Sequence, residues 1–230
     1  MRGKGLTAIA TRATASAALL ALCACSSSSS NADWDQVIDM VSGQLGSSSS
    51  DTITLQQAAA VPFASLGVRV GDGQEAMVIL AGQAGGDFLW TSKARIAVTT
   101  RHGRIVRTSG LPRNLDSLYF PAGDPILDAA KNPGHPIESA RMADFWDLNR
   151  YSVPLHCVAV SRGADPVTIL GKTIQTVRVD ETCEGSTMDW SFTDSFWVSD
   201  SGNVWKSIQH YHPDFDPLTL EILRPPKGAF

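Results

Sequence analysis

The spacing of apolar residues is helical near the start of the chain and changes to that of strands from Pro62 onward. Between Trp34 and Leu45 the apolar residues fall on one helical face, which predicts a short amphipathic helix. A second, brief helix is expected over residues 52–60. It should end before Pro62, because the residue that precedes a proline avoids the helical conformation. Helices are therefore expected to form only a small part of the chain.

Short apolar runs separated by turn residues follow. Gly71-Asp72-Gly73 and Gly171-Lys172 are typical of tight turns between antiparallel strands. Residues 110–143 contain five prolines and are expected to form a crossover loop, with a short helix near residues 126–131. We expect roughly nine to eleven strands, over residues 67–70, 76–81, 88–92, 95–100, 104–108, 146–160, 167–170, 173–181, 188–199, 204–211 and 218–223.

This order of elements predicts an all-β fold. No strand–helix–strand rhythm is visible, so we expect an antiparallel β-meander that forms a sandwich or a partly open barrel, with a short N-terminal helix. Residues 61–230 are expected to form a single all-β domain. Apolar residues make up 43% of the chain and charged residues 18%, which suits a folded core and excludes a disordered polyelectrolyte.

The first 24 residues have the layout of an export signal. Basic residues precede a small apolar stretch that is too short to span a bilayer. The stretch ends in Leu22-Cys23-Ala24-Cys25, which resembles the bacterial lipobox, with Cys25 as the lipidated residue. Cys23 fits less well, because Leu22 would then occupy a position that requires a small residue. The alternative is an ordinary secreted protein with two incidental cysteines.

Lipidation of Cys25 predicts a membrane-anchored protein, because several acyl chains together hold far more strongly than one. Residues 26–30 are serines and are expected to act as a flexible tether, so residues 25–60 comprise the lipidated cysteine, the tether and the short helix. Cleavage removes three of the 19 basic residues and none of the 23 acidic ones, which leaves a net charge of −7. An acidic chain binds the phosphate backbone poorly, so no nucleic-acid partner is expected.

Two cysteines, Cys157 and Cys183, lie beyond the anchor. The periplasm is oxidising, so we expect them to form a structural disulfide. The chain has no CxxC motif, which argues against a thiol–disulfide exchange enzyme, and neither cysteine has a second cysteine or histidine at the spacing of a zinc ligand.

Two groups of polar residues could form sites for chemistry. His210 and His212 could share one strand face and bind a metal together with His156 or Asp214; the alternative, a solvated strand edge, is preferred, and no metal or other cofactor is expected. A glycosidase needs two carboxylates that flank one bond. The candidate carboxylates are Asp180, Glu181, Glu184, Asp189 and Asp194. They are more simply explained as solvated turn residues, so no catalytic residue is expected.

Aromatic residues are the stronger surface candidates. Trp190 shares a strand face with Phe192, and Trp205 shares one with Tyr211 in the next strand. Exposed rings of this kind could stack on sugars or dock a protein partner, while the alternative is ordinary core packing. The candidate glycan or partner surface comprises Trp190, Trp197, Trp205 and Tyr211.

Four segments of the chain resemble the YjbF/GfcB family of lipoproteins, which is associated with exopolysaccharide and group 4 capsule production. They span most of the region between residues 61 and 226 and consist of Val61–Gly73, His102–Pro112, Phe196–Ser207 and Leu220–Pro226. The resemblance implies an all-β periplasmic body on an outer-membrane lipid anchor. It also implies a partner such as an outer-membrane β-barrel protein, and it carries over no catalytic residues. Ser26 follows Cys25, which by enterobacterial sorting rules favours the outer membrane, facing the periplasm.

These observations predict a noncatalytic accessory or scaffold lipoprotein in exopolysaccharide or capsule production and export. The alternatives are a periplasmic glycan-binding module and, less favoured, a glycan-modifying hydrolase. A hydrolase would need an accessible cleft with paired acids, whereas a glycan-binding module would need exposed rings.

Overall fold

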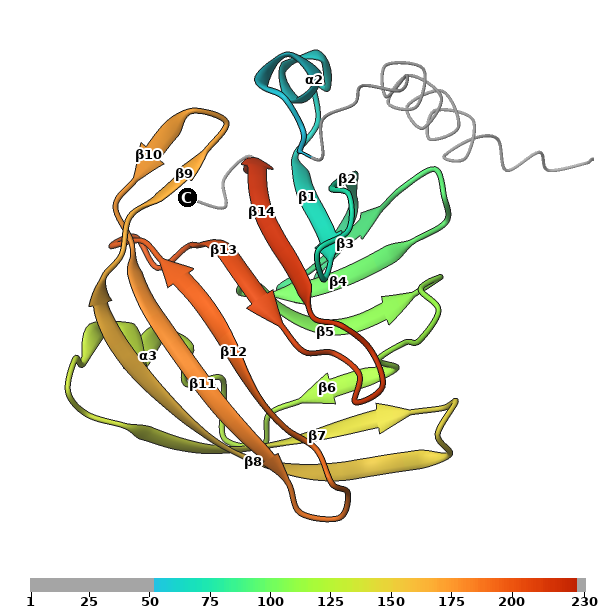
Figure 1. The fold of residues 1–230 in the computed structure, drawn as a ribbon, viewed down its shortest axis with the longest axis vertical. Helices are drawn as coiled ribbons and strands as arrows, with labels where there is room; N and C mark the ends of the chain where they lie inside the picture. The colour runs from blue at the N-terminus through green and yellow to red at the C-terminus, as the bar shows by residue number, and fades with distance from the viewer. Residues whose placement is uncertain (1–51, 227–230) are drawn as a thin grey trace, which may run out of the picture.

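The computed structural model describes residues 52–226. The helix expected over residues 34–45 and the lipidation site Cys25 lie outside the described residues. Within them the chain forms two short helices and fourteen strands (Figure 1). The helices are α2 Leu55–Ala60 and α3 Ile126–Lys131. The strands are β1 Ser65–Val70, β2 Ala76–Ala84, β3 Asp87–Thr91, β4 Ala97–Arg101, β5 Arg104–Ser109, β6 Ser117–Tyr119, β7 Ile137–Phe145, β8 Arg150–Ala164, β9 Val167–Ile169, β10 Lys172–Ile174, β11 Val177–Gly185, β12 Ser191–Val198, β13 Val204–Gln209 and β14 Leu218–Arg224.

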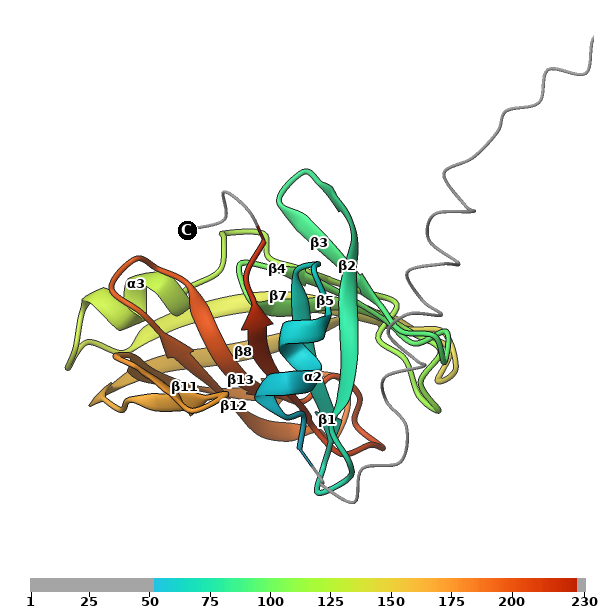
Figure 2. The same cartoon turned by 90° about the horizontal axis from the view of Figure 1, so that it is seen from above.

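Twelve strands form one antiparallel sheet, in the order β5-β4-β3-β2-β1-β14-β13-β12-β11-β8-β7-β6. The pairing of β1 with β14 joins the two ends of the described chain at the middle of this sheet. Its outer strands meet where the Thr108 backbone N–H of β5 donates to the Leu115 carbonyl before β6, at 2.8 Å. The sheet is therefore nearly closed (Figure 1 and Figure 2), which confirms the all-β prediction and favours the partly open barrel over the sandwich.

Both helices that the sequence predicts within residues 52–226 are present. Thr54 caps α2, and a reciprocal hydrogen-bond pair with Gln57 forms a capping box. The helix α3 covers the predicted residues, and its buried Ile126 and Ala129 pack against Phe196 of β12. No helix among residues 52–226 is long and apolar enough to cross a membrane.

The expected strand boundaries need correction around the proline-rich segment. Residues 110–143 were predicted as a loop, but they contain β6 and most of β7. The last proline of the segment is Pro136, and β7 begins directly after it. Residues 146–149 were predicted as strand and instead form the turn between β7 and β8, where Asn149 adopts a left-handed backbone conformation with φ 51°.

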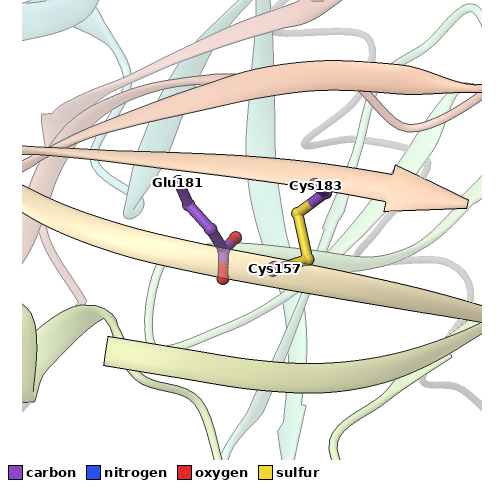
Figure 3. Close-up of side chains that lie close together, drawn as sticks. All are labelled: Cys157, Glu181 and Cys183. Atoms are coloured by element: carbon purple, nitrogen blue, oxygen red, sulfur yellow. A yellow bond between two sulfur atoms is a disulfide. The ribbon is translucent and has the colours of Figure 1, made fainter. Parts of the chain in front are cut away.

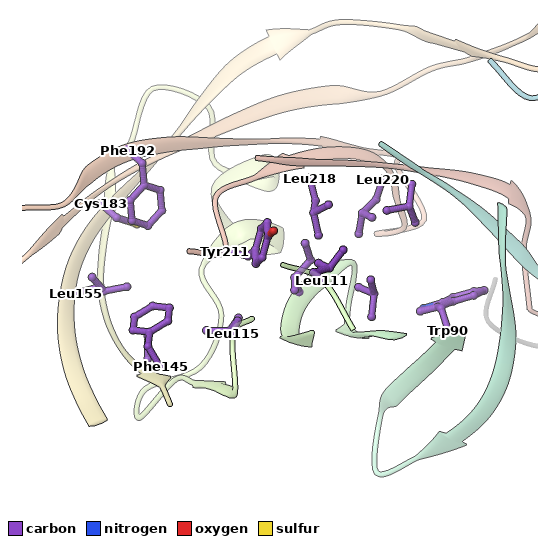
Figure 4. Packing of buried hydrophobic residues seen from close by; sticks show 14 of the residues in the cluster. Trp90, Leu111, Leu115, Phe145, Leu155, Cys183, Phe192, Tyr211, Leu218 and Leu220 are labelled. Atoms are coloured by element: carbon purple, nitrogen blue, oxygen red, sulfur yellow. The ribbon is translucent and has the colours of Figure 1, made fainter. Parts of the chain in front are cut away.

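The main core lies between the inner faces of the curved sheet (Figure 4). Trp90, Phe145, Tyr211 and Leu218 come from distant parts of the chain and are all buried there. Alternate residues of each strand point inward, as the strand geometry requires. The same alternation carries several charged side chains into this interior.

Candidate functional site

Two arginines and three carboxylates form an ion cluster inside the sheet. Arg104 of β5 contacts Asp124 (2.6 Å) and Glu181 of β11 (2.8 Å). Arg141 of β7 contacts Glu181 (3.0 Å) and Asp194 of β12 (3.2 Å). We call these five residues the ion cluster.

The sheet register explains why the arginines are there. Glu181 and Asp194 are direct cross-strand partners on the inner face, and two carboxylates in this position repel each other. Their side chains are 0% and 2% exposed, so water does not compensate the charge. Arg104 and Arg141 supply the compensation, and the guanidinium of Arg104 also lies 4.6 Å from the ring centroid of Phe196.

Charge pairing also fixes the protonation of Asp124 at the edge of the cluster. Burial opposes ionisation of this carboxyl, but the charge and hydrogen bonds of Arg104 and the backbone N–H of Ile126 outweigh it, so the pKa of Asp124 is lowered. A carboxylate held in its ionised form is a poor general acid.

The acids proposed for hydrolytic chemistry do not form an accessible pair. Glu181 and Asp194 lie together but are sealed from solvent and occupied by arginines. Asp180 is bound by Arg162 (3.0 Å) and Arg178 (2.7 Å). The remaining candidates, Glu184 and Asp189, are exposed. This arrangement suits a structural role for the acids.

The predicted disulfide joins Cys157 of β8 to Cys183 of β11, whose Cα atoms are 4.1 Å apart (Figure 3). The two residues are direct cross-strand partners. Arg141 Nη2 donates to Cys183 Sγ at 2.8 Å, so the bridge adjoins the ion cluster. Cys157, Cys183 and Glu181 are the one group of potential metal ligands within residues 52–226, but sulfurs that share a bond are not available as thiolate ligands.

The histidines considered for metal binding are held by separate acids. The strand β13 ends at Gln209, so the shared strand face expected for the two histidines does not form. His210 Nδ1 lies 3.3 Å from Asp194. His212 is buried, and its Nδ1 accepts from the Asp214 backbone N–H at 3.1 Å. Its Nε2 therefore carries the proton and donates to Asp147 at 3.2 Å. The exposed His156 lies near Glu138 instead.

The candidate aromatic surface is also corrected by the structure. Tyr211 is 1% exposed and belongs to the main core. Trp197 is 8% exposed because the hairpin of β9 and β10 covers it, and its indole N–H donates to Asp165 at 2.9 Å. Trp190 and Trp205 are half-buried in separate clusters. The four side chains therefore do not form one exposed surface.

A pocket of about 300 Å³ opens between β2–β4 on one side and β13–β14 on the other. All four segments that carry the family resemblance contribute to its lining, through Leu66, His102, Val204 and Leu220 among others. We call it the lobe pocket. The sequence pattern does not reveal this pocket, because its walls come from strands far apart in the chain.

The wall of the lobe pocket is mainly apolar, with Phe88, Trp90 and Ile222 beside the residues named above. Several polar groups of its lining are already bonded within the protein, including Lys206, which pairs with Glu221 at 2.8 Å. Trp90 Nε1 donates to Thr100 Oγ1 at 2.9 Å, and Ser207 Oγ accepts from Gln209 Nε2 at 2.8 Å. The pocket therefore suits an apolar group better than a polar one.

Two exposed aromatic residues were not singled out from the sequence. Trp146 and Tyr151 flank the turn between β7 and β8, with ring centroids 6.4 Å apart. The signal that could have revealed them is the turn sequence Asp147-Leu148-Asn149, which places flanking residues at a hairpin tip. We call Trp146 and Tyr151 the aromatic tip.

Comparison with known proteins connects this fold to a family. Residues 15–223 match the family model described as YjbF, group 4 capsule polysaccharide lipoprotein gfcB, YjbF. The uncharacterized lipoprotein YjbF of Escherichia coli K12 is 26% identical over 172 residues, which is 73% of this chain and 78% of YjbF. The uncharacterized lipoprotein GfcB of the same organism is 22% identical over 190 residues, or 82% and 89% of the two chains.

A solved structure shares the fold. The crystal structure of the hypothetical lipoprotein YmcC from Escherichia coli K12 matches with a TM-score of 0.72 at 22% sequence identity. The match covers 86% of this chain and 98% of YmcC. The nearly closed sheet is therefore a fold that this chain shares with a lipoprotein.

Proposed function

Because this chain belongs to the YjbF family of group 4 capsule polysaccharide lipoproteins, we propose that it is a noncatalytic accessory component in the production and export of a capsule or exopolysaccharide. The observation that carries the noncatalytic part is the burial of Glu181 and Asp194. The only two of the predicted acids that lie opposite each other are sealed inside the sheet and paired with arginines. They hold the fold together instead of meeting a substrate.

The lipid anchor at Cys25 places this body at the outer membrane, facing the periplasm. A family of lipoproteins supports membrane association, and the Leu22–Cys25 lipobox supports Cys25 as the attachment site. At this surface the protein acts beside an envelope partner such as an outer-membrane β-barrel protein. The tether and anchor keep the described domain within reach of that partner.

The variant Cys25→Ser tests the anchoring part of the proposal. We expect it to accumulate as a soluble periplasmic protein and to lower polymer export relative to the wild type. Cells that lack the chain provide the lower limit of export. Normal export from the soluble variant would show that membrane anchoring is not required for the function.

The lobe pocket is the binding site that we propose for an apolar group of a ligand. Gln83 is exposed at its mouth, so Gln83→Trp should obstruct entry without disturbing the core. The matched control is Gln175→Trp, which is also an exposed position but lies outside the lining. We expect reduced polymer export from the first variant only, with both proteins at wild-type levels. Equal export from both would argue against a role for the pocket.

Incubation of the purified lipoprotein with the polymer tests the absence of catalysis. We expect the length distribution of the polymer, measured by size-exclusion chromatography, to stay constant. Shortening that depends on the protein would favour the hydrolase alternative.

A further inference from the structure

The aromatic tip presents two large rings to solvent. Trp146 is 75% exposed and Tyr151 is 52% exposed, and Trp146 is the most exposed large apolar residue in the described part of the chain. Their rings meet edge to face at an interplanar angle of 68°. Because Trp146 keeps this exposure in spite of its contact with Tyr151, most of its surface stays available to a ligand.

The hairpin that carries these rings is held rigidly. The Trp146 backbone N–H donates to the carboxylate of Asp116. The Ser152 backbone N–H donates to Asp144 Oδ1 at 2.7 Å and supports a left-handed backbone conformation with φ 51°. Asn149, also left-handed, closes the turn by donating to the Trp146 carbonyl at 3.0 Å. A site fixed before binding loses little conformational entropy when a ligand arrives.

A second anchor lies at the base of the turn. Asp147 accepts from Arg113 at 3.0 Å and from the buried His212 at 3.2 Å. These two contacts outweigh the partial burial of the carboxyl and lower the pKa of Asp147. Asp147 follows Trp146 in the chain, Arg150 precedes Tyr151, and Arg113 is bound to Asp147, so exposed hydrogen-bond donors and an ionised acceptor belong to the same hairpin and its neighbour.

The size of the aromatic tip favours a small ligand over a protein. The two rings together expose roughly 300 Å² at most, given about 150–250 Å² for each aromatic side chain. A stable protein interface needs about 800 Å² from each partner. A ring pair of this size is instead comparable to the face of one or two sugar residues.

The charges around the tip favour a saccharide over a lipid surface. Three carboxylates lie close to the hairpin backbone that carries the rings: Asp116 accepts from the Trp146 N–H, Asp144 accepts from the Ser152 N–H, and Asp147 follows Trp146 in the chain. Carboxylates are repelled by anionic headgroups and do not enter the hydrocarbon layer. Hydroxyl groups of a sugar, in contrast, donate to carboxylates and accept from guanidinium groups, while the C–H face of the ring meets the electron-rich face of an aromatic ring.

We propose that the aromatic tip is a saccharide-binding site, in which the C–H face of a sugar ring stacks on Trp146, Tyr151 contacts the edge of the same sugar, and the hydroxyls bond to polar side chains of the hairpin and its neighbours. This inference deepens the proposed function and rests on it only for the choice of polymer. The tip is separate from the lobe pocket, because none of its residues lines that pocket.

Titration of the processed lipoprotein in a sugar-free detergent tests this site. The probe is the surface polysaccharide purified from the producing cells, and binding is followed by isothermal titration calorimetry. We expect Trp146→Ala and Tyr151→Ala each to weaken binding at least tenfold, and Trp146→Phe, which keeps a ring, to stay within about threefold of the wild type. Tyr119→Ala is the matched control, because Tyr119 is an exposed aromatic residue of β6 outside the tip.

Three outcomes would overturn the saccharide site. These are wild-type protein that binds no polysaccharide, a Trp146→Ala/Tyr151→Ala double variant that binds like the wild type, and an equal loss in Tyr119→Ala. The proposed function fails by a different result, unchanged polymer export from cells that lack the chain. The two proposals can therefore fail independently.

Discussion

Arg104 and Glu181 are 77 residues apart in sequence and form a buried ion pair of 2.8 Å across the interior of the sheet. Arg104 belongs to the edge strand β5, and Glu181 belongs to β11, near the other end of the strand order. The pair therefore links two parts of the sheet that backbone pairing does not connect directly. Asp124, bound to the same guanidinium, adds the segment before α3 to this link.

Removal of Arg104 should destabilise the fold strongly. Arg104→Ala leaves Asp124 without its cation and Glu181 with Arg141 alone, and a buried charge that loses its partner costs about 3–5 kcal/mol. Chemical unfolding in urea measures the change. The matched control is Arg101→Ala, which breaks the exposed pair with Asp87 and should cost less than about 1 kcal/mol. Equal losses for the two variants would contradict a structural role for the ion cluster.

Reduction of the Cys157–Cys183 bridge should also lower stability. The bridge closes a loop with a sequence separation of 26, and the loss of this restraint on the unfolded chain is worth about 3 kcal/mol. We expect the wild-type melting temperature to fall on addition of a reductant. The double variant Cys157→Ala/Cys183→Ala should melt at the lower temperature with or without the reductant. Identical melting of oxidised and reduced wild type would exclude a stabilising bridge.

Local sequence signals predicted local structure well. The boundaries of α3 follow from apolar spacing between prolines, and the turn at Gly71-Asp72-Gly73 between β1 and β2 follows from glycines that tolerate left-handed conformations. The disulfide follows from two cysteines in an oxidising compartment. The strand β7 was missed because the prolines before Pro136 concealed where the irregular segment ends.

Burial by distant segments could not be predicted in the same way. Alternation showed which residues share a face with Trp197, but not that β9 and β10 cover this face. From the sequence alone, Arg104 would be predicted to be solvent-exposed, because a single charged residue in a short strand is ordinarily solvated. Its burial depends on carboxylates that lie more than 70 residues later, at Glu181 and Asp194. The ion cluster and the lobe pocket are products of the tertiary fold.

The turn that precedes Arg104 offers a test of its packing. Gly103 has φ 83°, its carbonyl accepts from Gln209 at 2.9 Å, and a Cβ at this position would lie 2.4 Å from the Cβ of Val204. Gly103→Ala should therefore cost the left-handed strain of about 1–2 kcal/mol and a further 1–3 kcal/mol, roughly, for overpacking. Gly163→Ala isolates the strain, because Gly163 has φ 86° and open space around it. Equal unfolding free energies for the two variants would show that contact with Val204 is unimportant.

Glu75 has an unusual environment beside Gly67 of β1. Its side chain lies against Gly67, where a Cβ would be 2.1 Å from Glu75 Oε1, and its Oε2 accepts from the Ile53 backbone N–H at 2.7 Å. Burial raises the pKa of Glu75 above its ordinary value of 4.5, and the charge of Glu221 adds to this, against the effect of the Ile53 hydrogen bond. The carboxyl thus joins the start of the described chain to the sheet. Its ionised form is disfavoured there, because the charge is partly desolvated.

The raised pKa of Glu75 predicts how stability depends on pH. Because its pKa is raised in the fold, Glu75 holds its proton to a higher pH in the folded state than in the unfolded state. Its contribution to stability is therefore fully present below the unfolded pKa and is lost as pH rises through the folded pKa. A neutral amide keeps an acceptor for the Ile53 N–H without the charge, so Glu75→Gln should be more stable than the wild type at pH 8, with the difference shrinking toward pH 4. Urea unfolding of both proteins at several pH values checks this, with Glu184→Gln as an exposed control on β11 that should show no such trend. A Glu75→Gln variant less stable than the wild type at pH 8 would show that the ionised carboxylate is favourable in the fold, which contradicts the direction of the shift.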